Sequence, residues 1–116
     1  MEDNLSLENL ENLHTSVEAI RLYNDDNYKR LDNLMQAYWI ILKDLHKIAP
    51  AIFNNLATNG ITDLINRSNL IGRAIDSLEK TERYKDYWDY LMHMIKITID
   101  YIKNYLPESL VSTNVD

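Results

Sequence analysis

Apolar residues recur at helical spacing along most of the chain. In the first such stretch, residues 7–23, four of them lie three and four positions apart and mark one face of a helix: Leu10, Leu13, Val17 and Ile20. Residues 24–27 (Asn-Asp-Asp-Asn) interrupt the stretch, and such side chains favour turns because they compete for backbone hydrogen bonds. The heptad phase runs through the break, so one long helix is an alternative. The pattern favours a hairpin in which Asp26 or Asn27 caps the second helix.

A second apolar stripe spans residues 27–49. Pro50 ends this helix or begins the next, because the residue before a proline avoids the helical region. A short helix over residues 50–57 is expected to follow. Asn59 and Gly60 are then expected to close it with a left-handed cap.

Two more helices complete the pattern. Residues 62–80 are apolar on one side, and the five polar residues 79–83 predict a turn, although no Gly or Pro forces one there. Residues 82–106 form the most apolar helix. The sequence therefore predicts an all-α protein, an up-and-down bundle of four main helices plus one short helix. We expect a single domain over residues 1–116, with the tail 108–116 frayed.

Composition and charge limit the chemistry. There is no cysteine, which excludes disulfides and thiolate metal sites. The net charge is −6 and neither half of the chain is basic, which disfavours binding to nucleic acid through phosphates. The first residues lack the basic and apolar regions of a secretory signal, and the longest apolar run, residues 37–42, is too short to span a bilayer. We expect a cytoplasmic protein that does not enter membranes.

Candidate metal-binding and catalytic residues are few. Glu11 and His14 match one Glu-x-x-His element of a di-iron bundle, but such a site needs two of these elements and further carboxylates. His93 lies one helical turn from Asp89 on a charged stripe, and His46 has no acid in register. The Gly-rich loops and nucleophile motifs of common enzymes are also missing. We therefore expect no metal, no cofactor and no catalytic residue.

Residues 66–73 have low helix propensity for a predicted helix, because they include two Asn, a Ser and a Gly. In one interpretation they form a contact surface, where Gly72 allows close approach and Arg67, with Arg73 nearby, reaches an acidic partner. In the other, Arg67 simply lies along the helix surface with its charged end in water. The sequence does not separate the two.

The last helix has an apolar arc about twice as wide as a surface helix needs. Five residues can fill the core of the bundle: Tyr84, Trp88, Leu91, Ile95 and Ile102. A second arc then stays uncovered by this count, and we interpret it as a candidate interface: Tyr87, Tyr90, Met94, Ile97 and Tyr101. Exposed apolar patches of this size usually meet a partner, and a homodimer would pair the strip with itself. The alternative is that the short helix 50–57 covers the strip.

These patterns favour a non-enzymatic, acidic protein-interaction module, acting as an adaptor, assembly subunit or inhibitor, that forms a homo-oligomer and binds an unidentified protein partner. A second hypothesis is a subunit of a nucleic-acid-associated complex, which would use five cations: Arg67, Arg73, Lys80, Arg83 and Lys85. The third and weakest hypothesis is a metal-dependent helical enzyme that uses one or more of three histidines: His14, His46 and His93.

Overall fold

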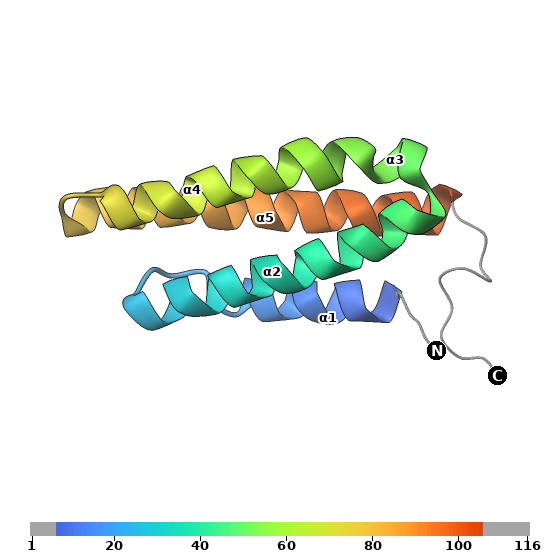
Figure 1. The fold of residues 1–116 in the computed structure, drawn as a ribbon. Helices are drawn as coiled ribbons and strands as arrows, with labels where there is room; N and C mark the ends of the chain where they lie inside the picture. The colour runs from blue at the N-terminus through green and yellow to red at the C-terminus, as the bar shows by residue number, and fades with distance from the viewer. Residues whose placement is uncertain (1–6, 106–116) are drawn as a thin grey trace.

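The computed structural model describes residues 7–105, which form helices and no strand (Figure 1). The elements are α1 (Leu7–Glu18), α2 (Asp25–Ile48), α3 (Pro50–Asn55), the π-helical turn η1 (Leu56–Gly60), α4 (Ile61–Arg73) and α5 (Ser77–Tyr105). This confirms the predicted all-α bundle of four main helices plus one short helix. The tail predicted to fray, 108–116, lies outside the described residues.

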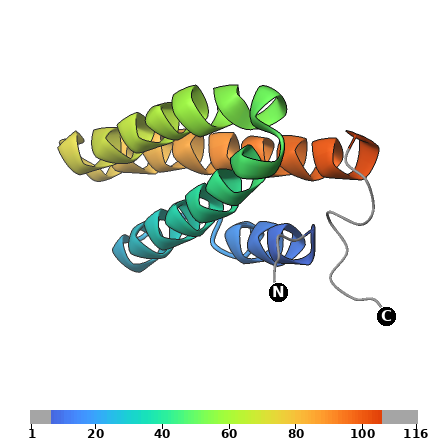
Figure 2. The same ribbon diagram turned by 45° about the vertical axis from the view of Figure 1, so that its right-hand side comes forward.

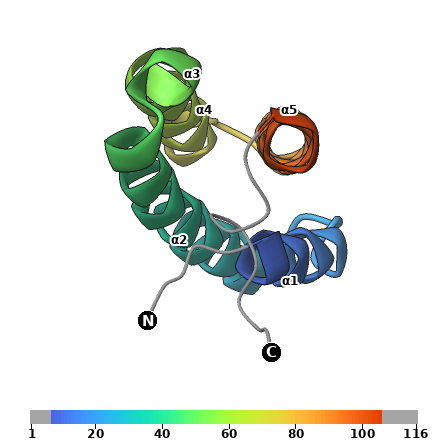
Figure 3. The same ribbon diagram turned by 90° about the vertical axis from the view of Figure 1, so that its right-hand side faces the viewer.

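Helix α5 is the element on which the others pack. Helix α4 lies antiparallel along one side of α5, and α1 packs against another side (Figure 1). Helix α2 crosses obliquely between the two, so it diverges from α4 toward its own N-terminal end (Figure 2). Seen along the bundle, α2 leads from the α3–α4 side to α1 and leaves part of α5 facing outward (Figure 3).

The α1–α2 connection is the predicted hairpin, with boundaries that differ from the prediction. Helix α1 ends at Glu18 rather than at residue 23. The cap of α2 is Asn24, whose Oδ1 accepts a hydrogen bond from the N–H of Asn27 at 2.7 Å. The prediction of Asp26 or Asn27 as the cap is therefore wrong, because the turn is fixed earlier. Asn27 Nδ2 instead donates to the carbonyl of Leu22 at 2.8 Å.

Side chains of α5 explain why α1 stops early. The indole N–H of Trp88 donates to the carbonyl of Val17 at 2.7 Å, and the hydroxyl of Tyr84 donates to the carbonyl of Ile20 at 2.6 Å. Carbonyls that a continuing helix would use are thus bound by another helix. Burial raises the pKa of Tyr84 to about 12.

The predicted left-handed cap at Asn59 and Gly60 is wrong. Gly60 has φ −64° and ψ −43°, the geometry of a right-handed helix, and η1 continues directly into α4. A Cβ at Gly60 would overlap the terminal methyl of Met94 on α5. The glycine therefore serves the close approach of two helices rather than the end of one.

The turn predicted over residues 79–83 lies instead at residues 74–76, where α4 gives way to α5. Asp76 Oδ1 accepts a hydrogen bond from the N–H of Glu79 at 2.8 Å. The carboxylate of Glu79 accepts one in return from the N–H of Ile75 at 3.3 Å. This reciprocal pair resembles a capping box and fixes the start of α5.

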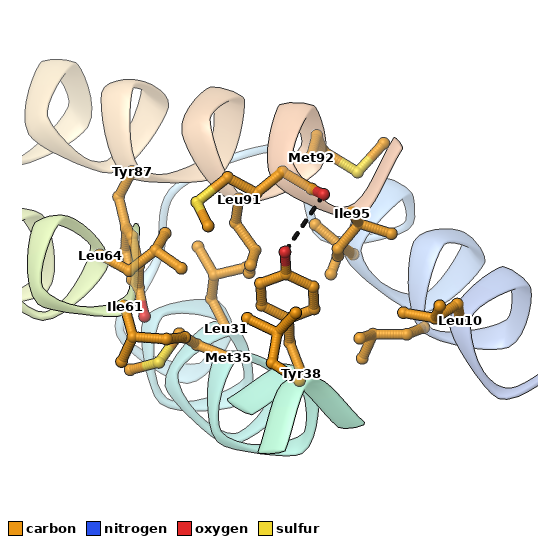
Figure 4. Packing of buried hydrophobic residues seen from close by; sticks show 14 of the residues in the cluster. Leu10, Leu31, Met35, Tyr38, Ile61, Leu64, Tyr87, Leu91, Met92 and Ile95 are labelled. Carbon is orange, nitrogen blue, oxygen red and sulfur yellow. Dashed lines mark hydrogen bonds between the residues drawn. The ribbon is translucent and has the colours of Figure 1, made fainter. Parts of the chain in front are cut away.

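One hydrophobic cluster joins the four longer helices and α3 (Figure 4). Tyr38 of α2 points into it, and its hydroxyl donates to the carbonyl of Met94 at 3.2 Å and lies 2.8 Å from the hydroxyl of Thr98. Burial raises the pKa of Tyr38 well above its ordinary value. Fully buried members come from each of the helices α1 to α5, among them Leu10, Leu31, Leu42, Phe53, Leu64, Leu91 and Ile95.

No helix within residues 7–105 combines the length and the apolarity that crossing a bilayer requires.

Candidate interaction surface

The second arc of α5 is covered within the chain, so its assignment as an exposed strip is wrong at two of five positions. Tyr87 is 0% exposed and Met94 is 2% exposed. Helix α4 lies along this side of α5, and Gly60 lets the chain approach Met94 closely. Ile97 is half-buried. Helix α4 thus covers more of the arc than the angular positions of the α5 residues alone predict.

Tyr90 and Arg67, both predicted as interface residues, hold α4 and α5 together. The guanidinium of Arg67 lies 4.0 Å above the centre of the Tyr90 ring. Its Nε lies 3.2 Å from Oδ2 of Asp86, although the N–H is not aligned for a hydrogen bond. The Tyr90 hydroxyl donates to Asp63 at 3.1 Å. Partial burial, and then this hydrogen bond, raise the pKa of Tyr90.

The end of the arc meets α3, as the alternative interpretation of the sequence proposed. Phe53 is fully buried and contacts Tyr101 edge to face, with ring centres 6.3 Å apart. Tyr101 keeps 38% of its surface exposed and also contacts Tyr105. Of the five predicted strip residues, Tyr101 alone is classed as exposed. The strip is therefore not a continuous apolar surface.

Gly72 and Arg73, the other two candidates, lie in the last turn of α4 and are exposed. A Cβ at Gly72 would make ordinary contact with the hydroxyl of Tyr28 at 3.6 Å. The structure thus does not require a glycine at this position. Neither residue lines the groove described next.

A groove of about 400 Å³ lies between α2 and α4, and the sequence did not predict it. Ile65 on its wall is 44% exposed, and Trp39 on the opposite wall is half-buried. Its lining combines four apolar and four polar side chains: Met35, Trp39, Ile61 and Ile65, with Asp32, Gln36, Ser68 and Asn69.

Two buried side chains of the core hold the carboxylate of Asp32 at this groove. Its Oδ1 accepts hydrogen bonds from the hydroxyls of Tyr87 and Ser68, each at 2.7 Å. The hydroxyl of Tyr28 donates to the carbonyl of Ser68 at 2.7 Å. Burial, and then the hydrogen bond to Asp32, raise the pKa of Tyr87 far above its ordinary value. The two donors are fixed in position, so they orient this carboxylate.

The histidines of the metal-enzyme hypothesis are not brought together into a ligand set. His14 and His93 line one polar hollow between α1 and α5, together with Glu18 and Asp89. His46 lies elsewhere, 3.4 Å from the side-chain oxygen of Asn54. Within residues 7–105, no three His, Asp or Glu side chains are placed to hold a metal ion. The expectation that the protein holds no metal remains a prediction.

The cations of the nucleic-acid hypothesis are largely matched by acids. Arg83 lies 3.7 Å from Glu79, and Lys85 lies 3.0 Å from Asp89. Arg67 pairs with an acid of α5, as described above. An acid beside three of the five cations weakens the local positive field, and the described part of the chain adds no support for a phosphate-binding surface.

Comparison of the chain with protein-family models, curated proteins and solved structures finds no match.

Proposed function

We propose that this chain is a non-enzymatic, acidic helical module that binds another protein through the α2–α4 groove. The observation that carries the proposal is the groove itself. It exposes apolar side chains of two helices beside a carboxylate held by the core. Grooves between helices commonly bind an amphipathic segment of a partner by covering its apolar face.

The partner in this proposal is a different protein. A homodimer through the second arc of α5 loses its basis, because α4 and α3 cover most of that arc. A homo-oligomer that uses the α2–α4 groove is the competing arrangement. A different partner protein and a second copy of this chain differ in the mass of the bound polypeptide, which the following experiment measures.

Replacing Ile65 by glutamate should abolish binding of the partner while the fold is kept. Ile65 lines the groove and is already partly in water, so a charge there blocks an apolar contact at a small cost in stability. The full chain is purified from the cells that make it, and proteins that remain bound are compared by mass. We expect a discrete partner with the wild type and none with Ile65→Glu.

The matched control is Ile75→Glu, since Ile75 is 90% exposed at the α4–α5 turn and does not line the groove. This variant should keep the partner. The urea midpoint of each variant checks the fold. Identical bound proteins from all three chains would contradict the proposal. If the protein lost from Ile65→Glu is a second copy of this chain, the groove forms a homo-oligomer instead of binding a different protein.

A further inference from the structure

Asp32 stands without a cation of its own within residues 7–105. Lys29 is three residues earlier on α2, a spacing at which ion pairs form on helices, yet the two side chains do not pair. Asp32 is turned toward α4 and α5 by the hydroxyls of Ser68 and Tyr87. Both hydrogen bonds use Oδ1, and no group in the described part of the chain binds Oδ2.

The surroundings of this carboxylate favour a cation of a partner. Half of the groove lining is apolar, and charges in partly dehydrated surroundings attract each other more strongly than charges in water. The protein as a whole is acidic, with a net charge of −6. A cationic partner is therefore attracted both at long range and at the groove.

A cation lies beside Trp39 of the groove wall, although it does not line the groove itself. The ammonium of Lys43 lies 5.4 Å from the centre of the Trp39 ring. Asp32 and Lys43 are eleven residues apart, about 16 Å along a helix. A partner cation is thus favoured at Asp32 and repelled at Lys43, which gives the bound segment a direction.

The apolar side chains of the groove come from two helices, which indicates an occupant larger than a small amine. Met35 and Trp39 belong to α2, and Ile61 and Ile65 belong to α4. A second helix laid between α2 and α4 covers this area with residues spaced three and four apart.

We propose that the α2–α4 groove binds an amphipathic helical segment of a partner protein, whose apolar stripe covers Trp39 and Ile65 and whose arginine or lysine reaches Asp32. The inference rests on the proposed function and adds the chemistry of the partner. Gln36 and Asn69 on the rim supply polar groups for the edges of the bound helix.

A double-mutant cycle tests the contact. The probe is a synthetic amphipathic helical peptide with a leucine stripe and one arginine, and the matched peptide has glutamine in place of the arginine. The full chain is used as wild type and as Asp32→Asn, which keeps an oxygen to accept from Tyr87 and Ser68. Fluorescence anisotropy of the labelled peptides gives the four affinities.

We expect the arginine peptide to bind the wild type at least about tenfold more tightly than the glutamine peptide does. On Asp32→Asn the two peptides should bind alike, because the arginine has lost its partner. Equal affinities on the wild type, the same arginine preference on both proteins, or no binding of either peptide would overturn the inference. The peptide comparison on the wild type decides the matter even if Asp32→Asn fails to fold.

The outcome also separates this inference from the proposed function. If Ile65→Glu loses a discrete partner but the peptides show no arginine preference, the groove remains a protein-binding surface. Its partner then does not use a cation at Asp32. Arginine-dependent self-association of the wild type would identify a second copy as the occupant and overturn the choice of a different protein.

Discussion

Replacing Phe53 by alanine is expected to lower the free energy of unfolding by about 3–5 kcal/mol. Phe53 is fully buried and packs edge to face on Tyr101, so it is the side chain that fixes α3 against the C-terminal part of α5. Truncation removes the buried ring and leaves a cavity between two short stretches of helix. Urea unfolding followed by circular dichroism measures the change.

The control for this variant is Ala51→Ser, an exposed position on the same short helix. It should change the free energy of unfolding by no more than about 0.5 kcal/mol. A Phe53→Ala protein as stable as the wild type would mean that α3 does not cover α5. The second arc of α5 would then again be a candidate interface.

Replacing Leu13 by alanine is expected to cost about 2–5 kcal/mol. Leu13 is buried in the middle of the stripe by which α1 packs onto α5. Helix α1 has only 12 residues, which is marginal for an isolated helix, so it depends on this packing. The same urea experiment measures the loss, with the exposed neighbour Asn12→Ala as the control.

A neutral result for Leu13→Ala would mean that the stripe of α1 faces solvent. A loss of similar size in Asn12→Ala would also count against the account, because it would point to helix propensity rather than burial as the cause.

The stripes that the sequence predicts are largely those that the fold buries. Leu10, Leu13, Val17 and Ile20 all lie in the core, and the Asn-rich break does separate two helices. These features were accessible because they depend on local periodicity. The start of α5 was accessible too, because Asp76 and Glu79 have the spacing of a capping box, although the prediction placed the turn at the polar run 79–83.

Other boundaries depend on contacts that a single sequence does not display. Asn-Gly at 59–60 is typical of a left-handed cap, yet Gly60 continues a helix that packs closely on Met94, 34 residues further on. The end of α1 is decided in the same way by Trp88 and Tyr84 of α5. Tertiary packing overrides the local preference in both cases.

The candidate surface illustrates the same limit. The width of the apolar arc of α5 correctly indicated that more than one element packs against this helix. The spacing of its apolar residues does not identify the second element, which is α4 of the same chain. The Asp32 site was missed because its two donors, Ser68 and Tyr87, are 36 and 55 residues away.

Photo-crosslinking from position 65 in living cells shows whether a protein binds in the α2–α4 groove. A photoreactive side chain replaces Ile65 in one variant and exposed Asn12, on α1, in another. We expect a discrete adduct with a different polypeptide from position 65 and none from position 12. No discrete adduct from position 65, or the same adduct from both positions, would contradict this proposal.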